Sequence, residues 1–310
     1  MANQFWAVTT FFNPARFKSL LSNYFVFKEK LKSQGINLLT VECAFENDEY
    51  EIPLEANVYR VRSNSVMWQK ERLVNHAVSL LPPDCKYFGW LDCDIIFTND
   101  NWADLAVEKL QKAHVIQLFK KVIYLPKDHL VYNGTDRILQ IQGIAWQKSV
   151  HKNWLNRRRM KELSFSAPGF AWAARRDFFH CPELGGIYDK NIIGSGDTFL
   201  VDCYLDSWDI HGFANKFTDS MKVHMMDWCK TFRKKEFVLD YIPVDIWHLW
   251  HGSLKNRKYM DRHDVILKYN YNPESDIILK GDTYEWNSDK KDLHEDIRQY
   301  FYDRKEDNVS

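Results

Sequence analysis

The sequence predicts an α/β domain whose central sheet is mostly parallel and flanked by helices. Two observations predict this fold class. In the first third of the chain, short apolar and β-branched runs alternate with stretches of helical periodicity, a pattern typical of strands joined by crossover helices. The chain also has 310 residues, of which 45% are hydrophobic, enough to bury one large core. We therefore expect one continuous domain.

The individual elements follow from periodicity and from the residues that interrupt it. Strands are expected at 5–12, 36–45, 57–62, 87–91 and 95–97. Helices are expected at 16–34, before Gly35, and at 65–81, before Pro82. Farther along we expect a strand at 114–119, a loop-rich stretch at 120–163, β structure at 166–179 and a helix from 194 to 204.

Composition restricts the classes of protein. The 42 basic residues balance 42 acidic ones, so no overall positive field would hold a long nucleic acid. The local basic runs are expected to be solvated faces or phosphate contacts; they comprise Arg157, Arg158 and Arg159, then Lys230, Arg233, Lys234 and Lys235. Aromatic residues make up 15% of the chain, which suits either sugar and nucleobase contacts or a large aromatic core.

Cysteine usage and hydropathy favour a cytoplasmic location. The six cysteines are scattered without a C-x-x-C pair, which predicts reduced thiols rather than a disulfide or zinc framework. No apolar run approaches the roughly 18 residues of a membrane span, and the first residues lack the pattern of a secretory signal. We expect no membrane span.

The strongest candidate site is Asp92-Cys93-Asp94, which follows the apolar strand at 87–91. A parallel strand delivers its carboxyl end to the ligand crevice, and two carboxylates there suit Mg²⁺ or Mn²⁺ bridging nucleotide phosphates. We expect Asp94 to be the direct ligand and Asp92 to bind ribose or support the metal. The alternative is a pair of solvated turn aspartates.

A second candidate lies at His248 and His251, followed by Lys255. Imidazole suits a borderline cation such as Mn²⁺, and the lysine suits phosphate. The spacing fits one helical face, a short strand or a turn. The alternative is a purely structural pair of histidines.

Two further segments carry polar groups. Asp197 follows Gly194-Ser195-Gly196 at a predicted helix start, where it serves either as a general base or as a helix cap. Ala167-Pro168-Gly169 offers another tight backbone. In the helix at 65–81, Lys70 is a candidate phosphate ligand, and the alternative is a solvated salt-bridged face.

These motifs in this order resemble the nucleotide-sugar glycosyltransferases of the GT-A fold, a Rossmann-like fold, and in particular its galactosyltransferase-like members with a D-x-D motif. The resemblance covers about residues 5–260. It implies a nucleotide-sugar half at about 1–120, an acceptor half at about 121–260, and a charged helical extension at 261–310 packed on the same domain.

The resemblance also implies roles for single residues. Thr9, Thr10, Phe11 and Asn13 would form the nucleotide pocket together with Arg62, Lys70, Asp92 and Lys255. Asp92 and Asp94 would bind the metal with His248 or His251, and Asp197 would be the base.

The expected function is metal-dependent transfer of a sugar, most simply from a UDP-sugar, to a hydroxyl acceptor. Inversion would use Asp197 as base, whereas in a retaining enzyme the leaving phosphate takes that role. Alternatives are a virus-encoded glycosyltransferase acting on hydroxymethylated DNA bases, a nucleotidyltransferase, a metal-dependent phosphoesterase and a carbohydrate-binding protein. The acceptor and the oligomeric state stay open, and the setting would be a bacterial or virus-infected cell.

Overall fold

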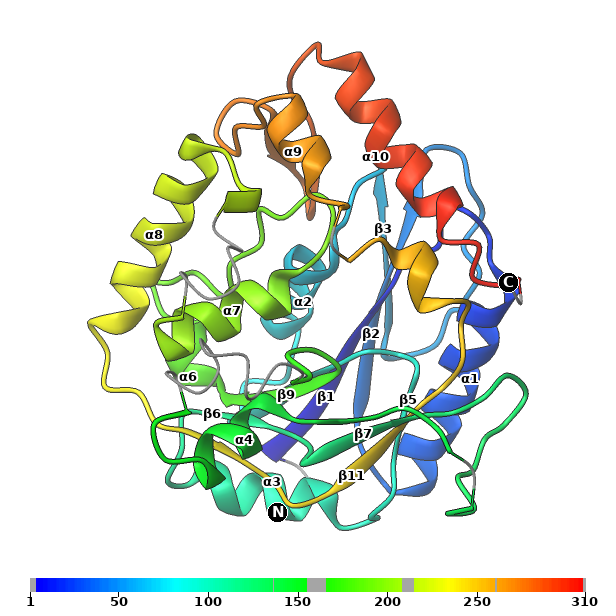
Figure 1. Cartoon of the computed structure of the whole chain (residues 1–310), viewed down its shortest axis with the longest axis vertical. Coiled ribbons are helices and arrows are strands. Elements are labelled where there is room, and N and C mark those ends of the chain that lie inside the picture. Colours follow the sequence, from blue (N-terminus) through cyan, green and yellow to red (C-terminus); the bar gives the residue numbers. More distant parts are fainter. Residues whose placement is uncertain (1–3, 136, 155–165, 208–214, 260, 309–310) are drawn as a thin grey trace.

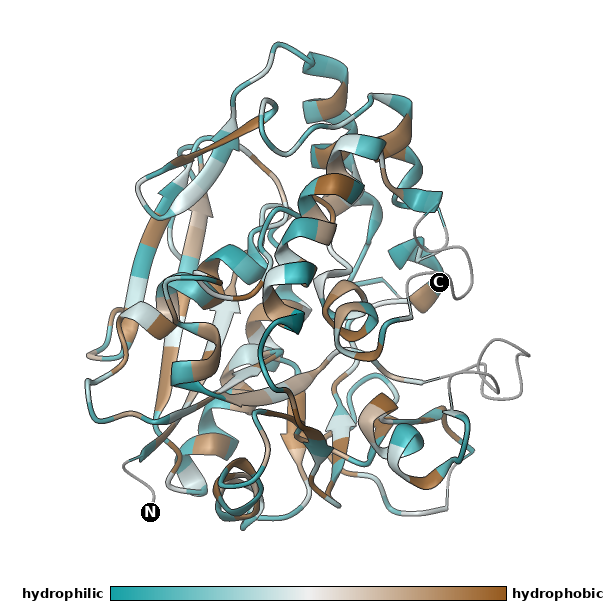
Figure 2. Cartoon of the chain, turned by 90° about the vertical axis from the view of Figure 1, so that its left-hand side faces the viewer, coloured by the Kyte–Doolittle hydropathy of each residue, from teal (hydrophilic) through white to brown (hydrophobic). Residues whose placement is uncertain are grey.

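The computed structural model describes residues 4–135, 137–154, 166–207, 215–259 and 261–308. A central sheet lies between two layers of helices (Figure 1). The arginine run at 157–159 lies outside the described residues. Hydrophobic residues follow the strands and the inward faces of the helices, whereas the loops are mostly hydrophilic (Figure 2).

The large sheet has seven strands in the order β10-β6-β9-β4-β1-β2-β3. Their bounds are β1 Phe5–Phe11, β2 Leu38–Phe45, β3 Val58–Ser63, β4 Tyr87–Leu91, β6 Val115–Gln117, β9 Ala171–Arg175 and β10 Leu239–Tyr241. Only β9 runs against its neighbours, so the predicted fold class with a mostly parallel sheet is confirmed. Since β9 is antiparallel to β4 with Ala171 opposite Leu91, it begins at the edge where β4 ends.

A second sheet covers this edge, with strand order β5-β11-β7-β8. Its strands are β5 Ile95–Phe97, β7 Lys121–Tyr124, β8 Gln140–Gln142 and β11 Asp245–His248, and a separate hairpin is formed by β12 Ile277–Lys280 and β13 Thr283–Trp286. The expected loop-rich stretch at 120–163 therefore contains β7, β8 and α4, Ile144–Val150. Strand β7 was missed because it is short and gains its stability by pairing with the distant β11.

The helices divide between the two faces of the large sheet. Their bounds are α1 Lys18–Ser33, α2 Lys70–Ser79, α3 Trp102–Leu110, α6 Arg176–Phe179, α7 Gly196–Leu205, α8 Asp219–Arg233, α9 Asp264–Lys268 and α10 Lys291–Asp303. Apolar side chains of α2, α7 and α8 pack on one face, and those of α1 and α3 pack on the other. The predicted helix at 65–81 begins only at Lys70, and 166–179 ends as helix α6 rather than strand.

Much of the aromatic content belongs to the core. Trp90, Trp102 and Trp172 are among the largest fully buried side chains, and Trp90 stacks on Trp172 across the β4–β9 pair. These indoles are therefore not available as flat surfaces for sugars.

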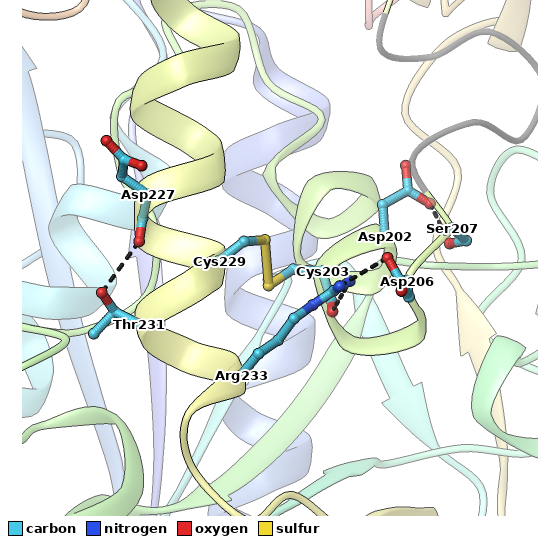
Figure 3. Close-up of a disulfide and its surroundings, with 8 residues drawn as sticks. All are labelled: Asp202, Cys203, Asp206, Ser207, Asp227, Cys229, Thr231 and Arg233. Atoms are coloured by element: carbon cyan, nitrogen blue, oxygen red, sulfur yellow. Dashed lines mark hydrogen bonds and ion pairs between the residues drawn. A yellow bond between two sulfur atoms is a disulfide. The ribbon is translucent and has the colours of Figure 1, made fainter.

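Helices α7 and α8 are joined by a disulfide between Cys203 and Cys229 (Figure 3). Beside it, Arg233 donates to the Cys203 carbonyl and pairs with Asp206. The prediction of reduced thiols is therefore wrong for this pair, because α7 and α8 bring together cysteines that are far apart in sequence. Cys43, Cys85, Cys93 and Cys181 are free. The cysteines thus no longer support a cytoplasmic location.

Within the described residues, no helix has the length and hydropathy needed to cross a bilayer.

Candidate metal centre and active site

Asp94, His248 and His251 form a cluster at the carboxyl edge of β4. The antiparallel pairing of β11 with β5 places His248 opposite Ile95, and the Leu249 amide donates to the Asp94 carbonyl at 2.8 Å. The Asp94 Oδ2 atom lies 2.8 Å from His251 Nε2 and 3.7 Å from His248 Nε2. One donor atom from each residue lies within 4.8 Å of the other two, and all three residues are buried.

The donor set of this cluster fits a divalent cation. Asp94 Oδ1 is buried without a hydrogen-bond partner, which leaves a carboxylate oxygen for a further ligand. The two histidine Nε2 atoms lie 3.0 Å apart and converge on the same carboxylate. One oxygen and two imidazole nitrogens suit Mn²⁺ or another borderline metal. Of the conformations that the sequence left open for this segment, a helical face, a short strand or a turn, His248 adopts the strand, as the last residue of β11.

Electrostatics favour the metal-binding states of His248 and Asp94 but oppose that of His251. Burial lowers the pKa of His248 to about 4, so its imidazole is neutral near pH 7. Burial favours neutral Asp94, but His251 and His248 overcome it and hold the pKa of Asp94 well below its usual range. Burial and Arg257 lower the pKa of His251, but Asp94 and Glu306 together raise it. Acid should therefore weaken cation binding by protonating His251.

Two charged residues absent from the predicted site reach this cluster. Arg257, on the 3-10 helix η3 at Leu254–Arg257, donates to the ring of His251. Glu306, after α10, is 1% exposed and lies 3.4 Å from His251 Nδ1. Burial raises the pKa of Glu306, but Arg304 and His251 outweigh this effect and lower it to about 2.

A second cluster surrounds the Lys70 ammonium. Lys70 Nζ lies 2.7 Å from Asp92 Oδ1 and 2.9 Å from Asp197 Oδ2, and the lysine is buried. Burial lowers the pKa of Lys70, but Asp197 and Asp92 raise it well above its usual range. The lysine is therefore charged and joins the first aspartate of D-x-D to the aspartate of α7.

The Asp197 carboxylate is in contact with the Lys70 ammonium. Its Oδ2 accepts a hydrogen bond from Lys70, and the residue at the N-cap position of α7 is Ser195. Asp197 is therefore not the N-cap residue of α7, and its role as a base stays a prediction.

Beneath Asp197 lies a second buried carboxyl group, Glu71. Burial raises its pKa to about 8, against the opposing effect of Lys70, so Glu71 is mostly protonated near pH 7. Gly196 is required here, because a Cβ atom at that position would lie 2.0 Å from the Glu71 side chain. The helix start and the acid of α2 therefore approach closely.

Other predicted residues have structural partners. The Thr9 hydroxyl donates to the Leu91 carbonyl at 2.7 Å, and the Phe11 ring packs on Tyr24. The Asn13 amide group donates to the Phe17 carbonyl at 3.0 Å, while its oxygen accepts from the Phe17 amide. Thr10 is half-buried on β1. These contacts tie the end of β1 to its surroundings.

Arg62 and Lys255 lie outside both clusters. Arg62 is exposed and donates to the Glu46 and Asp48 carbonyls at 2.6 and 2.9 Å. Lys255 is exposed on η3, and Arg257 of the same helix is the residue that contacts His251. Binding roles for Arg62 and Lys255 stay predictions.

A pocket of about 300 Å³ opens beside the metal cluster. His248, His251 and Arg257 contribute to its lining, together with Trp250 and Tyr124. The histidines therefore lie in the wall of a pocket whose volume is sufficient for a ligand of phosphate size.

The sequence contained little signal for the additional site residues. Glu306 lies in a charged tail with no motif, and Arg257 is one of several basic residues that follow His251. Lys70 was predicted as a binding residue, but only the packing of α2 against α7 shows that Lys70 and Glu71 are buried rather than part of a solvated helix face.

No protein-family model matches this chain, and no curated protein matches it in sequence. Several solved structures are similar. The catalytic domain of Drosophila β1,4-galactosyltransferase 7, in complex with xylobiose, matches with a TM-score of 0.35 and 16% identity, over 66% of this chain and 61% of that chain. A Desulfovibrio desulfuricans protein described as a nucleotide-diphospho-sugar transferase matches with a TM-score of 0.38 and 12% identity, over 97% and 99% of the two chains.

A 4-diphosphocytidyl-2C-methyl-D-erythritol synthase from Anaerococcus prevotii has a TM-score of 0.34 and 9% identity, over 77% of this chain and 88% of that chain. The match to the galactosyltransferase domain covers 61% of that domain, so the present chain spans less than two thirds of it. All three TM-scores lie below 0.5, so we base the proposed function on the residues of the site.

Proposed function

We propose that the protein is a metal-dependent glycosyltransferase of the GT-A type, which transfers a sugar from a nucleoside-diphosphate sugar, such as a UDP-sugar, to a hydroxyl group. One observation carries the proposal. The two aspartates of Asp92-Cys93-Asp94 lead into adjacent clusters, one with metal donors and one with a carboxylate held by an ammonium. Leaving-group stabilisation and proton removal are the two tasks that glycosyl transfer requires.

The metal cluster is suited to hold the diphosphate. Asp94, His248 and His251 would bind Mn²⁺ or Mg²⁺, which as a Lewis acid neutralises charge on the leaving diphosphate. Arg257 adds a fixed positive charge at the same pocket. Residues 9–13 would then contact the nucleoside at the carboxyl end of β1, with Asp92 near the ribose.

Asp197 is suited to accept the proton of the acceptor hydroxyl. Lys70 Nζ donates a charge-assisted hydrogen bond to its Oδ2 at 2.9 Å and so fixes the position of the carboxylate. An inverting mechanism follows from this assignment, because the base then acts on the acceptor directly. In a retaining mechanism the leaving phosphate would accept the proton, and Asp197 would only position the acceptor.

The described residues favour this function over its alternatives. They contain one group of three potential metal ligands, whereas a two-metal phosphoesterase needs a larger set. Lys230 and Arg233 each lie beside an acidic partner, Asp227 and Asp206, so these two basic residues do not form a purely positive surface for DNA. Burial of Trp90, Trp102 and Trp172 removes much of the support for a carbohydrate-binding protein.

A donor screen tests the proposal. Release of nucleoside diphosphate is measured for a panel of UDP-, GDP- and TDP-activated sugars, with Mn²⁺ or with excess chelator, and Asp94→Asn serves as the matched inactive control. We expect release from one donor class that depends on the metal and on Asp94. Turnover that persists in chelator with metal-free protein, or no turnover with any donor but metal-independent glycan binding, would contradict it.

A further inference from the structure

The segment after α10 is fixed against both the first helix and the metal cluster. The amides of Lys18 and Ser19 donate to the Asp307 carboxylate at 2.9 and 2.8 Å, and the Ser19 hydroxyl donates to the Glu306 carbonyl at 3.0 Å. Figure 1 shows this end of the chain beside α1. On the other side, a Cβ atom at Gly252 would lie 2.8 Å from the Glu306 Cα. The backbone at 306 is thus in direct contact with the turn after His251.

The Glu306 carboxylate faces one nitrogen of His251, and Asp94 faces the other. Glu306 Oε2 lies 3.4 Å from His251 Nδ1, and Asp94 Oδ2 lies 2.8 Å from His251 Nε2. The imidazole is 3% exposed, so its orientation is set by protein groups rather than by water. It therefore lies between two carboxylates, of which only Asp94 belongs to the metal donors.

This arrangement determines which nitrogen of His251 can bind a cation. A neutral imidazole has one N–H donor and one lone pair, and an ionised carboxylate only accepts hydrogen bonds. Asp94, the nearer carboxylate, attracts a proton to Nε2 while no cation is bound, and Glu306 is the acceptor that would keep the proton on Nδ1 once Nε2 binds a cation. Arg257, a pure donor, contacts both ring nitrogens and so selects neither tautomer, but its positive charge opposes a cation beside the ring. Glu306 offsets that charge, with its Oε1 lying 4.0 Å from the guanidinium.

We propose that Glu306 is a positioning residue of the metal centre, which orients His251 so that its Nε2 faces the cation and balances the charge of Arg257 beside it. This inference rests on the metal binding in the proposed function. A residue close to the end of this chain thereby completes a site that begins at Asp94.

Calorimetric titration with Mn²⁺ alone tests the proposal without any sugar substrate. We expect Glu306→Gln to bind Mn²⁺ about 10–100-fold more weakly than the parent protein, the range typical for loss of a group that orients a ligand. Glu306→Asp, which keeps the charge, should recover part of the affinity. Asp307→Asn is the matched control, because it weakens the adjacent contact with α1 and touches none of the metal donors.

The possible outcomes are distinct. Equal Mn²⁺ affinity in the parent and Glu306→Gln overturns this inference alone, and no Mn²⁺ binding by the parent overturns it together with the metal-dependent function. Equal weakening in Glu306→Gln and Asp307→Asn shows that the tail is only structural, which also overturns it. If Glu306→Gln does not fold, as judged by thermal melting, Glu306→Asp decides: weaker Mn²⁺ binding supports the proposal and unchanged binding overturns it.

Discussion

Asp92 and Asp94 are separated by one cysteine, yet they enter different environments. Asp94 faces two histidines, one of which is neutral near pH 7, and keeps one oxygen without a partner. Asp92 faces the Lys70 ammonium, which it shares with Asp197. A cation beside Asp94 would meet nitrogen lone pairs, whereas a cation beside Asp92 would meet another positive charge. The two aspartates therefore lie in opposite electrostatic environments, and we propose that they have separate tasks.

The pKa values of the two aspartates shift in opposite directions from their ordinary value. Histidines hold the pKa of Asp94 well below its usual range, although burial opposes them. Burial, aided by Asp197 and opposed by Lys70, raises the pKa of Asp92 to about 6. Asp94 is thus a permanent anion, and Asp92 is a carboxylate whose charge depends on its lysine. This contrast predicts unequal effects of matched substitutions.

The largest difference is expected between Asp94→Asn and Asp92→Asn. Loss of the Asp94 charge should remove Mn²⁺ binding and lower the transfer rate by about 10³-fold or more, since a Lewis acid contributes several kcal/mol to such a reaction. Asp92→Asn should leave Mn²⁺ affinity within about tenfold of the parent, because that carboxylate pairs with Lys70 and is not among the clustered metal donors. Titration calorimetry and transfer assays on both variants provide the comparison. Equal losses of Mn²⁺ affinity would show that both aspartates bind the metal.

The second largest effect is expected at Asp197. Asp197→Asn keeps the size of the side chain but removes the base, so transfer should slow by about 10²–10⁴-fold while UDP and Mn²⁺ affinities stay unchanged. Asp206→Asn is the matched control, because Asp206 lies at the other end of α7 and pairs with Arg233. Steady-state kinetics measure the transfer rate, and UDP titration measures the nucleotide affinity separately. A rate within a few-fold of the parent would assign Asp197 a structural role.

The smallest expected effect concerns stability at Glu71. Burial raises the pKa of Glu71 in the folded protein from the ordinary value of 4.5 to about 8. Between these two pH values, the native state therefore binds more protons than the unfolded chain. Stability should therefore decrease as pH rises through this window, by up to about 1.4 kcal/mol per pH unit.

Glu71→Gln removes this proton but keeps a neutral polar group in the same space. Between pH 5.5 and 7.5, the parent should lose about 2 kcal/mol more unfolding free energy than Glu71→Gln. Urea denaturation of both proteins at the two pH values measures the difference, and other titrating groups cancel in the comparison. Parallel pH profiles would mean that Glu71 is ionised in the folded protein.

Local patterns in the sequence predicted the elements but only part of the site. The strand before Asp92 was predictable because its apolar run ends in polar residues, and the order of motifs suggested that Asp94 and the late histidines lie together. The Lys70–Asp197 contact was not predicted, because it depends on how α2 and α7 pack on the same face of the sheet. The Cys203–Cys229 disulfide and Glu306 were missed for the same reason: both depend on contacts between distant segments.

The antiparallel pairing of β11 with β5 has a consequence for the order in which the protein is assembled. Asp94 is synthesised in the first third of the chain, but His248 and His251 reach it only after β11 has paired with β5, and Glu306 arrives later still. Contacts that span so much sequence form slowly, since loop closure precedes any gain from them. A nascent or refolding chain should therefore acquire its metal donors late, after β1, β2 and β4 have formed the centre of the sheet. Cation binding would then mark the completion of folding rather than initiate it.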